Sequence, residues 1–219
     1  ITEEQQKLYR ELKETWEVDN IELNNALAIG IKTQQISDGW VKLKEKVGVD
    51  LDGQDVFKEW VREVESNKAE YLVALMEEII AAGDKCIVWC AYKQDIQYLA
   101  SRIPFATLQM SSDEPLDVKA WNSGKFHAVI ATQASGSSIN DFAQVPYGIY
   151  YSQTFKWMDL QQSQGRHDRY SSAHSDCYFY FLHTQGSLDR HIYDTVKMSQ
   201  GLEHALIEKG ELSRWLKDQ

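Results

Sequence analysis

The segment CIVWCAY at residues 86–92 is a short apolar run without a single charged side chain. A strand that is buried on both faces of a parallel sheet has this composition, because helices cover both of its faces. A helix is expected just upstream, with Ser66 as its N-cap, Gly83 as its end and apolar residues at helical spacing between them. The segment therefore predicts a helix followed by a buried strand.

The same alternation of helix and strand continues along the chain. Helices are expected near 93–102, 114–122 and 157–169 and from Ser187 onward, and strands near 105–110, 128–131, 147–151 and 177–182. This alternation predicts an α/β fold with a parallel sheet and helices on both of its faces. Ligands of such sheets bind at the carboxyl ends of the strands, so we expect functional residues in the loops after residues 91, 110, 131 and 151.

The N-terminal part of the chain predicts a mainly helical segment. Residues 3–17 carry apolar side chains at a spacing of four that end at Trp16, which we expect in the core, and Thr2 can cap this helix together with Gln5. A second helix is expected over residues 21–36, where a turn with glycine ends it.

The pattern is least regular at residues 40–65, where turn signals separate two apolar groups. The second group, residues 57–64, fits either a short strand or a helix. The sequence therefore divides into a helical lead-in segment at 1–65 and an α/β lobe at 66–219.

Composition narrows the class of protein. The 219 residues are 43% hydrophobic, which is enough for one full core or two modest ones. No apolar run approaches the roughly 20 residues of a membrane-spanning helix, so no membrane contact is expected. The chain opens with Ile1 and a charged stretch, so we expect no signal peptide and interpret the sequence as a piece of a longer protein.

Cysteine usage and charge exclude further classes. Three cysteines without a Cys-x-x-Cys pair argue against a disulfide scaffold and favour the cytoplasm or another reducing compartment, and six histidines without zinc spacing predict no metal site. The formal charge is −10, and residues 1–80 hold 18 Asp and Glu against 10 Lys and Arg. This balance argues against nonspecific polyanion binding, although a local patch can still contact phosphate.

The strongest candidate for a functional site is QSQGRHDR at residues 162–169. On a helix, Arg166 and Arg169 lie on one face, and Gln162 lies about one turn before Arg166. Guanidinium groups stay charged and offer two parallel donors, which suits the charge that develops on a phosphoryl group during cleavage. Gly165 permits a close approach to the helix backbone.

The alternative is that the two arginines pair with Asp159 or Asp168 on a solvated helix face. However, the order Gln-x-x-Gly-Arg-x-x-Arg is more specific than a pair of arginines. The octet resembles the arginine-finger motif of superfamily-two helicases and translocases. This resemblance implies catalytic roles for Arg166 and Arg169.

A second motif strengthens the resemblance. Residues 131–140, ATQASGSSIN, follow an expected strand and resemble the family's preceding motif. The last of them, Asn140, lies 26 residues before Arg166. Taken alone, such a Ser/Gly-rich turn fits a plain loop between strand and helix as well as it fits a functional motif. The resemblance implies contacts with the nucleic-acid backbone from Thr132, Gln133, Gly136, Ser137 and Ser138. It implies nucleotide contacts from Asn140, Gln162 and Gly165.

The resemblance covers nearly the whole chain. Residues 86–95 are similar to the motif that opens the family's second RecA-like lobe. Similarity to the Swi/Snf-type branch lies at residues 1–9, 35–39 and 186–192. The sequence departs from that branch at Ser135 and Ser138, where the branch has glycine, and at residues 170–172, where Tyr-Ser-Ser replaces Ile-Gly-Gln.

The resemblance implies the second, C-terminal RecA-like lobe of a DNA-dependent ATPase, either a helicase or a double-strand DNA translocase. The phosphate-binding P-loop pattern is missing, since the Gly-Lys pair at 124–125 precedes Phe126. ATP and Mg²⁺ are therefore expected mainly on a first lobe outside this sequence, which would be its partner together with DNA, and the isolated lobe is expected to be inactive. Two alternatives stay open: a lobe of an RNA helicase, and a non-catalytic interaction module with the same fold.

Overall fold

The computed structural model describes residues 1–198 apart from 20, 24, 51, 139–141 and 169–173. The described residues divide into two compact units. Among the described residues, the first unit comprises Ile1–Asn67 and Thr184–Leu188, and the second comprises Lys68–His183 and Asp189–Met198. Within the described part of the chain, no helix is both long and apolar enough to cross a membrane.

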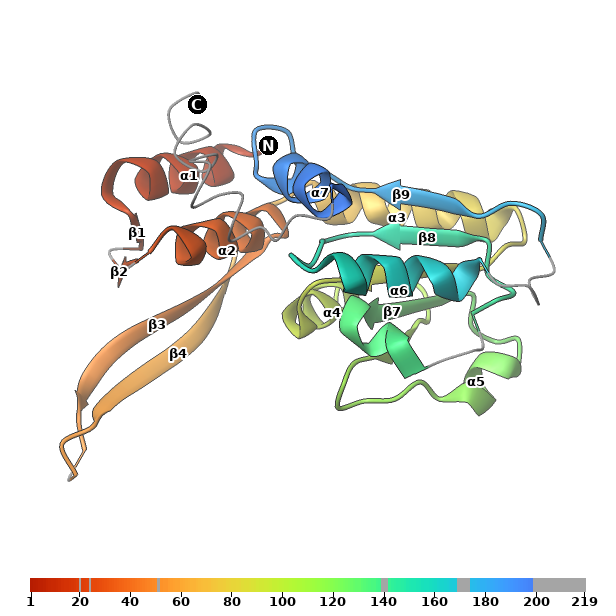
Figure 1. Cartoon of the computed structure of the whole chain (residues 1–219), viewed down its shortest axis with the longest axis horizontal. Coiled ribbons are helices and arrows are strands. Elements are labelled where there is room, and N and C mark those ends of the chain that lie inside the picture. The colour runs from red at the N-terminus through yellow and green to blue at the C-terminus, as the bar shows by residue number, and fades with distance from the viewer. Residues whose placement is uncertain (20, 24, 51, 139–141, 169–173, 199–219) are drawn as a thin grey trace. The chain divides into compact units, whose positions relative to one another are not determined.

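The second unit is built on a parallel sheet of five strands (Figure 1). The strands are β5 (Cys86–Cys90), β6 (Leu108–Met110), β7 (Ala128–Thr132), β8 (Tyr147–Tyr150) and β9 (Tyr178–Phe181). Their order across the sheet is β6-β7-β5-β8-β9, and every neighbouring pair is parallel. The predicted parallel α/β fold is confirmed.

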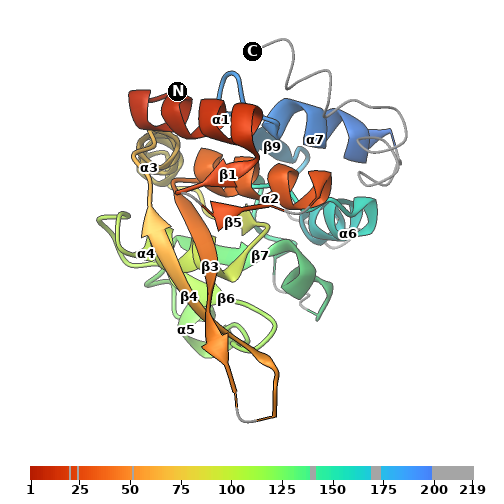
Figure 2. The same ribbon diagram turned by 90° about the vertical axis from the view of Figure 1, so that its left-hand side faces the viewer.

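Helices cover both faces of this sheet. They are α3 (Lys68–Ala81), α4 (Lys93–Ala100), α5 (Val118–Asn122), α6 (Trp157–His167) and α7 (Asp189–Lys197), with a 3₁₀ helix η1 (Gln133–Ser138) after β7. Figures 1 and 2 place α6 on one face and α3 and α4 on the other. Both faces of the central strands are therefore shielded from water, as their apolar sequence predicts.

The core of the second unit is centred on β5. All five residues of this strand and all five of β7 are buried. Burial raises the pKa of the Cys86 thiol to about 12, because the thiolate would lose its hydration. Cys86 and Cys90 thus behave as the small core residues that the sequence predicts.

The first unit begins with α1 (Glu3–Thr15), which has the predicted capping box. Gln5 N donates to Thr2 Oγ1 at 3.2 Å, and Thr2 N donates to Gln5 Oε1 at 3.0 Å. The core position expected for Trp16 is wrong, because its side chain is 43% exposed. Trp16 has a φ of 59°, so it ends the helix in the left-handed region and leaves the apolar stripe.

The second helix starts later than predicted. Residues Glu17–Val18 (β1) and Ile21–Glu22 (β2) pair as a short antiparallel hairpin, and α2 (Ala26–Ser37) follows it. Asn25 caps α2, since its Oδ1 accepts a hydrogen bond from Ala28 N at 2.8 Å. The apolar spacing of residues 21–36 did not indicate the turn that precedes this cap.

Residues 40–65 form a β-hairpin of β3 (Trp40–Val49) and β4 (Asp55–Glu63). This result resolves the open choice between strand and helix for the second apolar group. In Figure 2 the hairpin is a long twisted ribbon whose far half extends beyond α1 and α2. Val47 and Val49 are each 56% exposed, so apolar residues stand on solvated positions here and blur the alternation that marks a strand.

Candidate functional site

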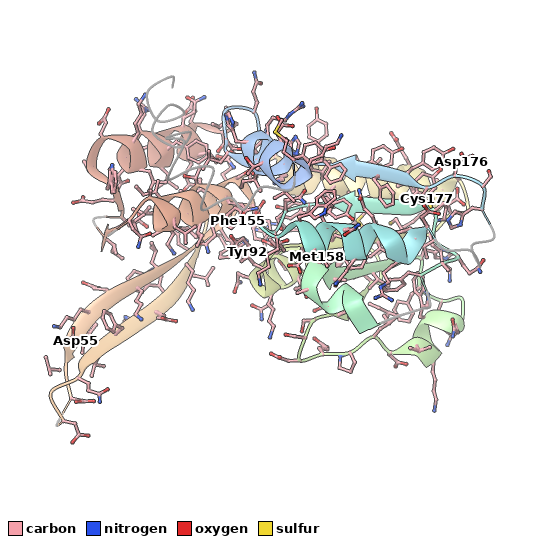
Figure 3. All side chains as sticks on the ribbon, in the orientation of Figure 1. Asp55, Tyr92, Phe155, Met158, Asp176 and Cys177 are labelled. Carbon is pink, nitrogen blue, oxygen red and sulfur yellow. The ribbon has the colours of Figure 1, made fainter. Side chains whose placement is uncertain are left out.

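The loops expected to carry function meet at one edge of the parallel sheet. Figure 3 shows Tyr92, Phe155 and Met158 near the carboxyl ends of the strands, whereas Asp176 and Cys177 lie at the opposite end. Tyr92 follows β5, and the other two residues lie after β8. Parallel strands bring their carboxyl ends to a common edge, which explains this assembly.

Buried hydrogen bonds tie the loop after β5 to the loop after β8. Ser152 Oγ donates to Asp95 Oδ2 at 2.5 Å and accepts from Ala91 N at 2.7 Å. Asp95 Oδ2 also accepts from Tyr92 N at 3.0 Å. The Asp95 side chain is fully buried at the start of α4. These bonds hold two neighbouring strand ends in one fixed arrangement.

Gln133 connects the loop after β7 to the same structure. Its Nε2 donates to Ser152 O at 2.9 Å, and its Oε1 accepts from Thr154 N at 3.3 Å and from Thr154 Oγ1 at 3.1 Å. The side chain is fully buried. The nucleic-acid contact predicted for Gln133 stays a prediction, and in this structure only its backbone could supply it.

Thr132 ends β7 and helps to shape η1. Its Oγ1 donates to Ser135 Oγ at 3.0 Å, and Ser135 Oγ donates to Thr132 O at 2.7 Å. Both side chains are buried. The backbone of η1 then carries three further predicted contact residues: Gly136, Ser137 and Ser138. Asn140 lies outside the described residues.

Helix α6 ends at His167, two residues before Arg169 and earlier than the predicted residue 169, so it carries only the first part of the arginine motif. The helix packs against η1. Gln162 and Arg166 are partly buried and four residues apart, so they share one stripe of the helix. Gly165 is exposed, and a Cβ added there would meet no atom within 4 Å. The structure thus brings the first part of the arginine motif next to the segment after β7. Arg169 lies outside the described residues.

Two polar residues that were not among the predicted site residues lie on the buried face of α6. Ser163 and His167 are fully buried beside Leu160. Ser163 lies three residues after Leu160, and His167 lies four residues after Ser163, which is the periodicity of a core-facing stripe that the sequence shows. The pairing of His167 with Trp89 could not be predicted from the sequence pattern, because 78 residues separate the two.

The donor groups along α6 suit an anion better than a cation. A guanidinium and side-chain amides donate hydrogen bonds to phosphate oxygens. Cations are held by carboxylates, thiolates and imidazoles. In the ranges that the structure describes, no three His, Cys, Asp or Glu side chains gather in a way that could hold a metal ion.

Comparisons with known proteins place the fold. No protein-family model and no curated protein match the sequence. The crystal structure of the C-terminal part of the Fun30 ATPase domain is similar with a TM-score of 0.52 and 17% identity, over 60% of this chain and 45% of that one. The crystal structure of the Pyrococcus furiosus Hef helicase domain gives a TM-score of 0.46 and 16% identity, over 67% of this chain and 29% of that one.

The chain therefore spans less than half the length of either solved structure. At this level of identity the likeness concerns the fold alone. The fold expected from the motifs is confirmed: it is shared with the C-terminal part of the Fun30 ATPase domain.

Proposed function

We propose that this chain is the C-terminal motor lobe of a DNA-dependent ATPase, a helicase or a double-strand DNA translocase. ATP and Mg²⁺ would bind mainly to a first lobe, and Arg166 and Arg169 would complete the ATP site when the lobes close. One observation carries the proposal: α6 holds Gln162, Gly165 and Arg166 outside its buried face and packs against η1. The described part of the arginine motif and the segment after β7 are thus neighbours in the fold.

Phosphate recognition is the chemistry that supports this role. An arginine that reaches a phosphoryl group only after lobe closure stabilises the transition state more than the ground state. The open space beside Gly165 would let a nucleotide approach the helix backbone. Arg166 would hold and orient the phosphoryl oxygens, while the chemistry of Mg²⁺ belongs to the first lobe.

On the nucleic-acid side, we assign the contacts to η1. The buried hydroxyl pair of Thr132 and Ser135 bends the chain there, and the backbone of residues 136–138 follows. Backbone amides and small hydroxyl groups read phosphates without reading sequence. The expected binding is therefore independent of sequence and steeply dependent on salt.

Substitution of the arginines tests the proposal in a protein that carries both lobes. We expect Arg166→Ala and Arg169→Ala each to lower DNA-stimulated ATP turnover by on the order of 10³-fold, by analogy with arginine fingers supplied in trans. Arg166→Lys should restore little, because an ammonium group cannot make the planar two-pronged contact. ATP binding and the melting temperature should change little.

Arg10→Ala is the matched control. Arg10 is an exposed arginine on α1 whose Nε donates to the backbone of its own helix, at Gln6 O. Its loss should leave turnover unchanged. Normal turnover in folded Arg166→Ala protein, or turnover that falls only in proportion to unfolded protein, would contradict the arginine-finger role and favour a structural ion pair.

The alternatives are separated by the same assay. Greater stimulation by RNA than by DNA would favour the RNA helicase, since backbone contacts do not distinguish the sugars. Nucleic-acid binding without any stimulated ATP turnover would favour the non-catalytic interaction module.

A further inference from the structure

Helix α6 is fixed to the sheet by polar contacts on its buried face. Ser163 Oγ donates to Leu160 O at 2.8 Å, within its own helix. The same Oγ lies 2.8 Å from Tyr150 Oη, which acts as the donor because the serine proton is already used. Burial raises the pKa of Tyr150, so the phenol keeps its proton. This contact joins the middle of α6 to β8.

His167 makes a second contact one turn later. The Trp89 indole donates from Nε1 to His167 Nε2 at 3.0 Å. An indole nitrogen can only donate, so His167 Nε2 must accept and the ring proton must lie on Nδ1. Nδ1 lies 2.8 Å from Val145 O and therefore donates to it. One neutral tautomer thus ties the last turn of α6 to β5 and to the segment before β8.

The space around the His167 ring is closed. The ring is fully buried and meets Phe179 edge to face, with centroids 5.4 Å apart. A Cβ added to Gly148 would lie 2.9 Å from Phe179 Cδ1 and 3.1 Å from His167 Nε2. The imidazole therefore cannot move toward β8, and its two hydrogen bonds keep their geometry.

We propose that Ser163 and His167 form a register lock that sets the rotation of α6, and that His167 is a positioning residue for Arg166. Residues 163 and 167 directly follow 162 and 166, so each anchor lies about 100° around the helix from a proposed nucleotide contact. The inference rests on the proposed function, since it concerns the direction in which Arg166 leaves the helix.

Polar anchors add a directional constraint to an apolar face. Apolar burial itself is non-directional, so it sets the rotation of a helix only through the shapes of the packed side chains. Hydrogen bonds to Trp89 and Tyr150 have preferred distances and angles, so they select one rotation. A misplacement of about 1 Å in a catalytic group can cost about 10²-fold in rate. The rotation of α6 therefore matters for Arg166, which would act at a distance from the core.

The test breaks the Trp89–His167 bond from each side in the two-lobe protein. Trp89→Phe removes the donor, and His167→Asn removes the acceptor while keeping a donor near Val145 O. We expect each variant to lower kcat for DNA-stimulated ATP turnover by about 10- to 100-fold with KM for ATP changed less than about twofold. The double variant should be no worse than the single ones. His167→Gln, which can return an acceptor to Trp89, should recover part of the loss.

Gln161→Ala, on the exposed side of α6, is the matched control and should keep kcat unchanged. Folded Trp89→Phe and His167→Asn proteins with kcat within about twofold of wild type, or with additive losses, would overturn the lock. If Arg166→Ala itself leaves turnover intact, the proposed function fails instead, so the two failures are distinguishable.

A measurement on the 219-residue chain covers variants that fold poorly in the larger protein. Asp168 N donates to Gln164 O at 3.3 Å in the last turn of α6. Hydrogen exchange at the amides of residues 164–168 should accelerate at least tenfold in His167→Asn, while the amides of β7 keep their protection. Equal protection in both proteins would overturn the proposal.

Discussion

The inner and outer sides of α6 differ in how far packing accounts for their residues. On the inner side, Ser163 and His167 are fully buried, and hydrogen bonds and ring contacts within the second unit account for them. On the outer side, Gly165 is exposed and has open space where a side chain would stand. The fold accounts for the identities of the inner residues, Ser163 and His167. It does not explain a glycine in the last turn of this helix.

This difference separates structural from functional residues by a physical criterion. Glycine in a helix costs about 1 kcal/mol relative to alanine, and nothing packed against Gly165 requires it. Gly148 is the opposite case, because Phe179 and His167 would collide with any side chain there. A residue that the fold does not need, on a helix that packs against the segment after β7, is a candidate for contact with a ligand.

Acid should act on the inner side of α6 with the largest effect. Burial lowers the pKa of His167 from its ordinary value of 6.5 to about 4, which the Val145 carbonyl opposes and nearby His174 reinforces. Between these two pH values the unfolded chain binds a proton that the folded chain does not. The free energy of unfolding should therefore fall as pH drops from 6.5 to 4, by about 3 kcal/mol from this group.

Denaturant unfolding at several pH values, with His167→Gln as the reference, isolates this contribution. The subtraction is needed because burial also lowers the pKa of His183, which acts in the same direction. Above pH 6.5 the two proteins should differ by a constant amount. Parallel curves between pH 6.5 and 4 would mean that His167 is protonated as easily in the folded chain as in the unfolded one.

Gly148→Ala should give the next largest effect. The added methyl group would lie 2.9 Å from Phe179 Cδ1 and 3.1 Å from His167 Nε2, so the rings must shift and the Trp89 bond must lengthen. Overpacking of this kind costs about 1 to 3 kcal/mol. Gly48→Ala in β3 is the control, because a Cβ there meets nothing within 4 Å. Equal melting temperatures for the two variants would show that the inner side of α6 is less closed than the structure indicates.

The sequence predicted the parts of the fold that depend on local patterns. The apolar runs of β5 and β7 indicate strands that are buried on both faces. The periodicity of α6 indicates a helix that is buried on one face. The predicted boundaries were wrong where a cap or a turn sets them. Helix α5 begins at Val118 and not near residue 114, because Asp117 Oδ1 accepts a hydrogen bond from Ala120 N at 2.9 Å. The exposed β3–β4 hairpin carries no clear alternation and could not be recognised.

The site was predicted less completely than the fold, for a similar reason. The arginine motif is local in sequence, so the helix that carries its first part could be inferred. The inward orientation of Gln133 depends on Ser152 and Thr154, about 20 residues away. The anchoring of His167 depends on Trp89 in another strand. Such long-range pairings become visible only once the chain is folded.

Gly165→Ala should give the smallest change in stability and the clearest contrast between the two sides of α6. Gly165 lies two residues before the end of α6, and its added methyl group would point into open space. The free energy of unfolding of the 219-residue chain should therefore rise, by up to about 1 kcal/mol. In the two-lobe protein, DNA-stimulated ATP turnover should nevertheless fall, and Gly165→Leu should lower it further, because a side chain would fill the space proposed for the nucleotide. Stability and turnover measured on the same preparations decide the matter. If both variants are at least as stable as wild type and keep full turnover, the open space at Gly165 is not where a nucleotide approaches, and the outer side of α6 needs another explanation.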